Sequence, residues 1–64
     1  MTNTIPTPAE AIAYIRKIEA SWGVAPFTDY CCRTSIDEDS MSVTTPNYCW
    51  NVWYQPDGTL YGEA

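Results

Sequence analysis

The fold of this chain is decided by the sequence YCWNVWY at residues 48–54, followed by QPDGT at residues 55–59. Aromatic and β-branched side chains suit a pleated, half-buried strand, and this segment has four aromatic residues in seven positions. Strand alternation separates two faces, with Tyr48, Trp50, Val52 and Tyr54 on one and Cys49, Asn51 and Trp53 on the other. We expect the first set to face the core.

A tight turn follows this segment at Pro56, Asp57 and Gly58. Proline fixes its own φ, aspartate tolerates the bridge region of backbone space, and glycine accepts a positive φ. The pattern therefore predicts a central strand at residues 48–55 that runs into a hairpin.

A helix is predicted at residues 8–22, after a frayed or extended lead-in at 1–6. Thr7 is a suitable N-cap, Pro8 suits the first helical position, and Glu10 completes a capping box. Gly23 is placed to end the helix in a left-handed conformation. Spacings of three and four predict one buried stripe made of Ala11, Ile12, Ile15, Ile18 and Trp22, with Tyr14 at its edge.

Further strands are predicted at residues 28–36, 41–45 and, as a short last strand, 59–61. In the first of them, Tyr30, Cys32, Thr34 and Ile36 alternate with Asp29, Cys31, Arg33 and Ser35. The whole chain, residues 1–64, is expected to form a single small α+β domain. One N-terminal amphipathic helix packs on a three- to four-stranded antiparallel meander in the order α-β-β-β-β, leaving the other sheet face partly open.

The net charge of −5, from eight acidic and three basic residues in 64, limits the partners of the protein. Binding of nucleic acid or of an anionic membrane requires a basic patch, which three cations cannot supply. Partners with a basic surface are favoured instead. No apolar run approaches the roughly 20 residues that cross a bilayer, and the first residues have neither the basic nor the apolar region typical of a signal peptide, so none is expected. We expect a soluble, cytoplasmic protein.

The three cysteines, Cys31, Cys32 and Cys49, are an odd number with two adjacent, which is a poor disulfide framework. Free thiols in a reducing cytosol are expected, and a bridge from Cys49 to Cys31 or Cys32 stays an alternative. The chain has no histidine and no Cys-x-x-Cys, so neither a metal nor another cofactor is expected.

Catalysis is not expected either. Histidine, the usual general base, is absent, and the sequence has no phosphate-binding loop and no nucleophile motif. The available carboxylates lie on expected hairpin tips, where water prevents tuning of their pKa values by burial. These carboxylates are Asp37, Glu38, Asp39 and Asp57.

A surface for binding another protein is the leading functional hypothesis, because so small a domain cannot bury all nine of its aromatic side chains. Trp53 is the expected anchor, since tryptophan, tyrosine and arginine dominate interface hot spots. Asp37, Glu38 and Asp39 are expected to steer a basic partner, with Arg33 and Tyr61 as lesser contacts.

Two functions follow from this hypothesis. In the first, the protein is a non-catalytic acidic binding module, an inhibitor or antagonist that occludes a basic surface of its partner, as small phage-encoded antagonists of host defences do. In the second, it is a structural subunit that homodimerises through the open sheet face. Two simpler interpretations stand beside them: the acidic segment is only a solvated hairpin tip, and Trp53 is covered by the N-terminal segment or a second copy.

Overall fold

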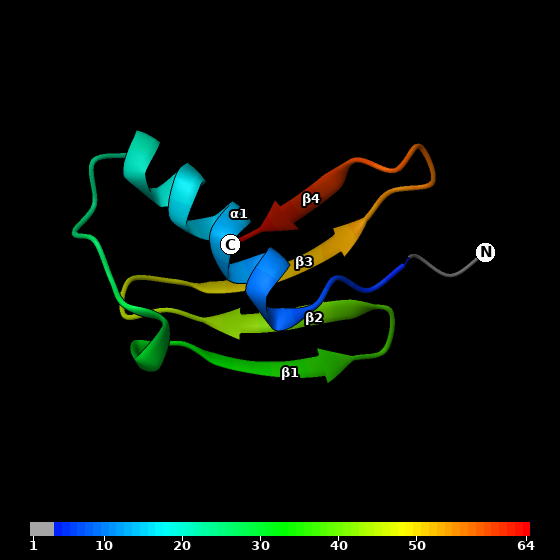
Figure 1. The fold of residues 1–64 in the computed structure, drawn as a ribbon, viewed down its shortest axis with the longest axis horizontal. Helices are drawn as coiled ribbons and strands as arrows, with labels where there is room; N and C mark the ends of the chain where they lie inside the picture. Colours follow the sequence, from blue (N-terminus) through cyan, green and yellow to red (C-terminus); the bar gives the residue numbers. More distant parts are fainter. Residues whose placement is uncertain (1–3) are drawn as a thin grey trace.

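The computed structural model describes residues 4–64, so that residues 1–3 of the expected lead-in lie outside the described part. The elements are α1 (Pro8–Ser21), a short 3-10 helix η1 (Asp29–Cys31), β1 (Arg33–Asp37), β2 (Ser40–Thr44), β3 (Cys49–Tyr54) and β4 (Leu60–Glu63). The strands form one antiparallel sheet in the order β1-β2-β3-β4, and α1 lies across one face of it (Figure 1). The predicted α+β fold, a helix followed by a meander, is confirmed.

The two ends of α1 have the predicted chemistry. The Thr7 hydroxyl accepts the N–H of Glu10 at 3.2 Å, and the Glu10 carboxylate accepts the N–H of Thr7 at 2.9 Å. Past the last turn, Gly23 has a φ of 76° and donates its N–H to the carbonyl of Ala20 at 3.1 Å. Both signals satisfy backbone groups that a helix end leaves without intrahelical partners.

The core lies between α1 and the middle of the sheet. Its buried apolar residues are Ala11, Ile12, Ile15, Met41, Val43, Trp50 and Val52. Trp50 and Val52 are the central positions of the predicted core-facing set of β3, so this part of the alternation is confirmed. At the β4 side, a Cβ on Gly62 would come within 2.9 Å of the Tyr14 ring. The absence of a side chain at Gly62 therefore lets the helix side chains approach β4 closely.

One charged side chain, Glu19, is buried with this core, with 1% of its surface exposed. Its carboxylate accepts hydrogen bonds from the Trp50 indole N–H at 2.9 Å, the Thr45 hydroxyl at 2.8 Å and the Asn47 amide at 2.7 Å. The three donors come from β3 and from the β2–β3 connection. Because a buried carboxylate is costly unless it is hydrogen-bonded, these contacts fix the C-terminal half of α1 over that connection.

The predicted strand at residues 28–36 is wrong in its first half. Residues 29–31 form η1, in which the N–H of Cys31 donates to the carbonyl of Thr28 at 3.0 Å. The register explains the difference, since Arg33 already pairs with Thr44 and earlier residues would face the β2–β3 turn instead of a strand. Tyr30, expected on a half-buried face, is fully exposed.

Trp22 and Tyr48, both predicted to face the core, are more exposed than the sequence pattern suggested, with Tyr48 40% exposed, and so is Ile36 of β1. Ile36 is 70% exposed, because β1 lies at the edge of the sheet and α1 packs over β2 and β3. Trp22 caps the end of α1 and is 52% exposed, with one ring face stacked on Trp50 at a centroid distance of 5.3 Å. The other strands differ from their predicted bounds by one or two residues.

The buried carboxylate provides a test of the packing. Replacement Glu19→Ala leaves three donors without their acceptor and is expected to lower the free energy of unfolding by about 3 kcal/mol. Urea denaturation measures this change. The matched control is Glu63→Ala, which removes an exposed acid and should cost less than about 0.5 kcal/mol. Equal effects of the two substitutions would contradict the assigned role of Glu19.

The capping box provides a pH test. The Thr7 N–H, followed by the Tyr54 hydroxyl at 2.7 Å, holds the pKa of Glu10 below its ordinary value of 4.5. A lowered folded pKa means that this contribution to stability is present above the unfolded pKa and is lost as the pH falls through the folded one. Replacement Tyr54→Phe should raise the pKa of Glu10 part of the way back in an NMR titration. Tyr61→Phe, the control, should leave it unchanged.

Candidate functional site

The face of the sheet that α1 leaves uncovered is called the outer face. Residues paired across an antiparallel sheet share a face, so the register assigns its members. They are Arg33, Ser35, Asp37, Ser40, Ser42, Thr44, Cys49, Asn51, Trp53, Tyr61 and Glu63. Trp53 thus lies on the opposite face from Trp50, as the alternation of the aromatic segment predicts.

The outer face consists of three rows that cross the strands. The first row contains Asp37, Ser40, Trp53 and Tyr61, the second Ser35, Ser42, Asn51 and Glu63, and the third Arg33, Thr44 and Cys49. The second row is therefore made of polar side chains, with the charged Glu63 at the β4 edge, and the large aromatic side chains of the face are confined to the first row. Such a surface can be approached closely by another molecule, with the aromatic residues standing out at one end.

Trp53 and Tyr61 form an aromatic pair on this face. Their ring centroids are 5.2 Å apart and their planes make an angle of 64°, which is the edge-to-face geometry that aromatic rings prefer. Trp53 is partly buried and Tyr61 is 40% exposed. The two rings together therefore form a partly exposed apolar surface on the outer face.

An acidic hairpin lies beside the aromatic row. Asp37 pairs with Ser40, and the turn between them contains Glu38 and Asp39. Glu38 has a φ of 51°, a left-handed conformation that is uncommon for residues other than glycine. Asp37, Glu38 and Asp39 are all exposed. Since Asp37 belongs to the first row, the acidic side chains and the aromatic pair are parts of one end of the outer face.

A fourth acid lies at the same end of the sheet, because the β1–β2 and β3–β4 turns of a meander lie on one side (Figure 1). This acid is Asp57, in the β3–β4 turn. It accepts the N–H of Thr59 at 2.9 Å, and this hydrogen bond holds the pKa of Asp57 below its ordinary value.

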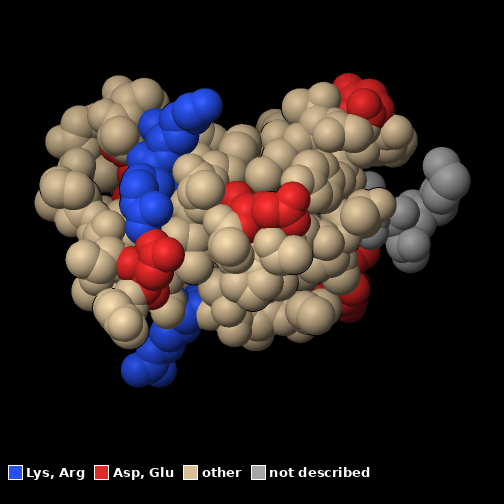
Figure 2. Space-filling view, viewed as in Figure 1, with Lys and Arg blue, Asp and Glu red and all other residues tan. Residues whose placement is uncertain are grey.

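The cations lie toward the other end of the molecule. Figure 2 shows the Lys and Arg atoms gathered at the end opposite the two acidic hairpins. Arg33 begins β1 there, and Arg16 forms an ion pair with Asp29 and lies 5.2 Å from the centre of the Phe27 ring. The predicted site residues Trp53, Tyr61 and Asp37 are thus brought together, with Glu38 and Asp39 at their rim. Arg33 is not part of this group.

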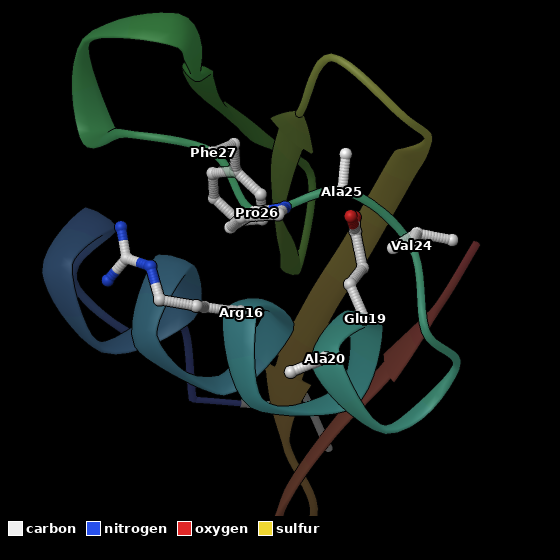
Figure 3. Close-up of a pocket in the computed structure, with 7 residues that line it drawn as sticks. All are labelled: Arg16, Glu19, Ala20, Val24, Ala25, Pro26 and Phe27. Atoms are coloured by element: carbon white, nitrogen blue, oxygen red, sulfur yellow. The ribbon is translucent and has the colours of Figure 1, made fainter.

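A hollow of about 270 Å³ lies on the other side of the molecule, between α1 and the segment that follows it (Figure 3). Its lining residues are Arg16, Glu19, Ala20, Val24, Ala25, Pro26 and Phe27. Both of its charged groups are already engaged, Arg16 with Asp29 and Glu19 with its three donors. The hollow therefore offers a ligand mainly apolar contact.

The three cysteines are free thiols, with Cys31 and Cys49 exposed and Cys32 partly buried. Burial, followed by the nearby Asp29 carboxylate, raises the pKa of the Cys32 thiol, which is the reverse of the activation that a nucleophilic cysteine needs. In residues 4–64, no group of three or more acidic or cysteine side chains is arranged to hold a metal ion.

Two features were missed by sequence reasoning. Glu63, which lies beyond the strand predicted at residues 59–61, ends β4 and joins the second row of the outer face opposite Asn51. Glu19 received no role, although its position four residues after Ile15 and three before Trp22 places it on the apolar stripe. An acidic residue inside an apolar stripe indicates a carboxylate that is buried and hydrogen-bonded, and this pattern could have identified Glu19.

Comparisons with protein-family models, with curated proteins and with solved structures found no match. Among the described residues, no helix is long and apolar enough to span a membrane.

The two faces of β3 predict different costs for removing its tryptophans. Trp53→Ala loses the edge-to-face contact with Tyr61 and should cost about 1 kcal/mol of unfolding free energy. Trp50→Ala removes a buried ring and a hydrogen bond to Glu19, and should cost about 3–5 kcal/mol. Trp22→Ala, at a half-exposed position, should fall between them. Urea denaturation of the three variants tests this order, and a cost for Trp53→Ala equal to that of Trp50→Ala would place Trp53 in the core.

Proposed function

We propose that the protein is a non-catalytic binding module that occludes a basic surface on another protein, as an inhibitor or antagonist does. The observation that carries the proposal is the first row of the outer face. It joins a partly exposed aromatic pair, Trp53 and Tyr61, to an acidic hairpin on a sheet face that no other described element covers.

The two parts of the row have complementary roles in binding. Acidic side chains at one end of a protein attract a basic partner and raise the rate of encounter, but add little affinity while they stay solvated. An aromatic side chain that becomes buried on contact supplies affinity. Asp37, Glu38 and Asp39 would orient the partner, and Trp53 would be the anchor that the contact buries.

The charge distribution supports a basic protein as the partner. The net charge is −5, and the nearest cation on the outer face, Arg33, lies at the far end of β1. Nucleic acid would be repelled by the acidic end, and so would an anionic membrane surface. A cytoplasmic location belongs to the same proposal, since three free thiols suit a reducing compartment.

A structural subunit that homodimerises through the outer face is less well supported. Obligate dimer interfaces are more apolar than ordinary surface, whereas the second row of this face consists of two serines, an asparagine and a glutamate. Stacking two such faces would bury these polar groups, and nothing in the register supplies each of them with a hydrogen-bond partner.

The proposal is tested by capturing partners from a cell extract with tagged protein at low and high salt, and identifying them by mass. A partner that binds the wild-type chain should be released by high salt, since solvated charges are screened. Trp53→Ala should weaken its binding by about thirtyfold, the loss expected for a hot spot of about 2 kcal/mol. The triple variant Asp37→Asn, Glu38→Gln, Asp39→Asn should reduce the salt dependence.

The control is Tyr30→Ala, which removes a fully exposed aromatic side chain from η1, outside the outer face. It should bind the partner as the wild-type chain does. A partner that Trp53→Ala retains as strongly as Tyr30→Ala does would contradict the proposed site.

A further inference from the structure

Strand β1 has one edge paired with β2 and one edge that faces no strand among residues 4–64. All five of its residues, Arg33–Asp37, are exposed. A free edge presents unpaired N–H and C=O groups that can pair with another strand, and proteins usually protect it with proline, a bulge or a charge in the middle of the strand. The middle of β1 is Thr-Ser-Ile, which has none of these protections.

The sequence of β1, RTSID, is complementary to itself when two copies run antiparallel about Ser35. Arg33 then lies opposite Asp37 of the second copy, and Asp37 opposite its Arg33. Thr34 and Ile36 pair in the same reciprocal way. Directly opposite side chains in such a pair have Cβ atoms about 5 Å apart, so two oppositely charged pairs form on the outer face.

Of the possible alignments of two β1 strands, only this one places both Arg33 side chains opposite an Asp37 side chain. Parallel pairing would place Arg33 beside Arg33 and Asp37 beside Asp37, which is destabilising. A shift of two residues in either direction removes Arg33 from Asp37. The other free edge, β4, has no comparable symmetry, because its only charged residue is Glu63.

The exposed Ile36 supports the same alignment. Its side chain lies on the helix face of the sheet, beyond the strands that α1 covers, and 70% of its surface is exposed. In the antiparallel pair, Ile36 from each copy lies next to the two-fold axis on that face, diagonal to its equivalent and within reach of it. An isoleucine that a single chain leaves in water would thus be covered by its own copy.

We propose that the protein forms a symmetric dimer by antiparallel pairing of the β1 edges of two copies, centred on Ser35. The result is a continuous eight-stranded sheet with both α1 helices on one face. The two outer faces adjoin on the other face and stay accessible. Asp37 belongs both to this edge and to the first row of the outer face, but the dimer does not depend on the proposed function, because the pairing uses the edge of the sheet and leaves Trp53 free.

The test is a charge exchange between two variants, followed by analytical ultracentrifugation over a wide range of concentration. The wild-type mass should rise with concentration from 7.2 kDa toward twice that value. Arg33→Asp and Asp37→Arg alone should each weaken dimerisation roughly tenfold or more, since each creates like-charge pairs. When mixed, the two variants should form a heterodimer, because the two acidic ends of β1 in one variant then lie opposite the two basic ends of β1 in the other.

Circular dichroism of each variant checks that it folds, and Arg33→Glu with Asp37→Lys provides a second pair. Trp53→Ala should leave the dimer unchanged, and amide exchange in β1 should slow as the wild-type concentration rises. Three results would overturn the proposal: a wild-type chain that stays monomeric, a mixture that associates no better than its components, or a dimer that Trp53→Ala dissociates.

Discussion

A single helix of 14 residues provides most of the cover for one face of a four-stranded sheet in the described part of this chain, with Ile5, Phe27 and Cys32 packed beside it. With its side chains a helix is about 10–12 Å wide, whereas four strands span about 14 Å between the outermost backbones. One helix can therefore cover one face of the middle strands and nothing more. The outer face and the edge strand β1 are left in contact with water. The proposed partner-binding surface and the proposed dimer edge both exist because the helix does not reach them.

The carboxylate of Glu19 determines where the helix lies. It accepts hydrogen bonds from the indole of Trp50 and from the polar groups of the β2–β3 connection, so that the C-terminal half of α1 stays over that connection. Trp50 consequently faces inward, with the Trp22 ring stacked on it. Because adjacent positions of a strand alternate, the same contact determines that Trp53 faces outward. A buried polar interaction on one face of β3 thus specifies which aromatic side chain is available on the other.

The features that the sequence predicted well depend on local chemistry. The capping box at Thr7 and Glu10, the stop at Gly23 and the alternation of β3 each involve residues close together in the chain. Features that depend on distant partners were harder to predict. The extent of β1 is limited by where β2 ends, and the exposure of Ile36 and Trp22 depends on how far the helix reaches.

The candidate site shows the same division. The predicted alternation placed Trp53 on the open side, and the acidic segment was expected at a hairpin tip. That Asp37 and Trp53 share a row depends on the pairing of three strands, which no single segment encodes. Arg33 is separated from the group for the same reason, at the opposite end of its strand. Glu19 was overlooked because a charged residue at one position of an apolar stripe has weight only when its three donors are known.

Binding at the outer face requires that this face be uncovered in the folded chain, with Trp53 on it and Trp50 beneath the helix. The most direct measurement is NMR relaxation of the tryptophan indole protons in the presence of a soluble paramagnetic probe, at low protein concentration. We expect strong broadening for Trp53 and little for Trp50, whose surface is 2% exposed. Equal protection of the two rings would contradict this expectation, because Trp53 would then be covered and the outer face would not be free to bind a partner.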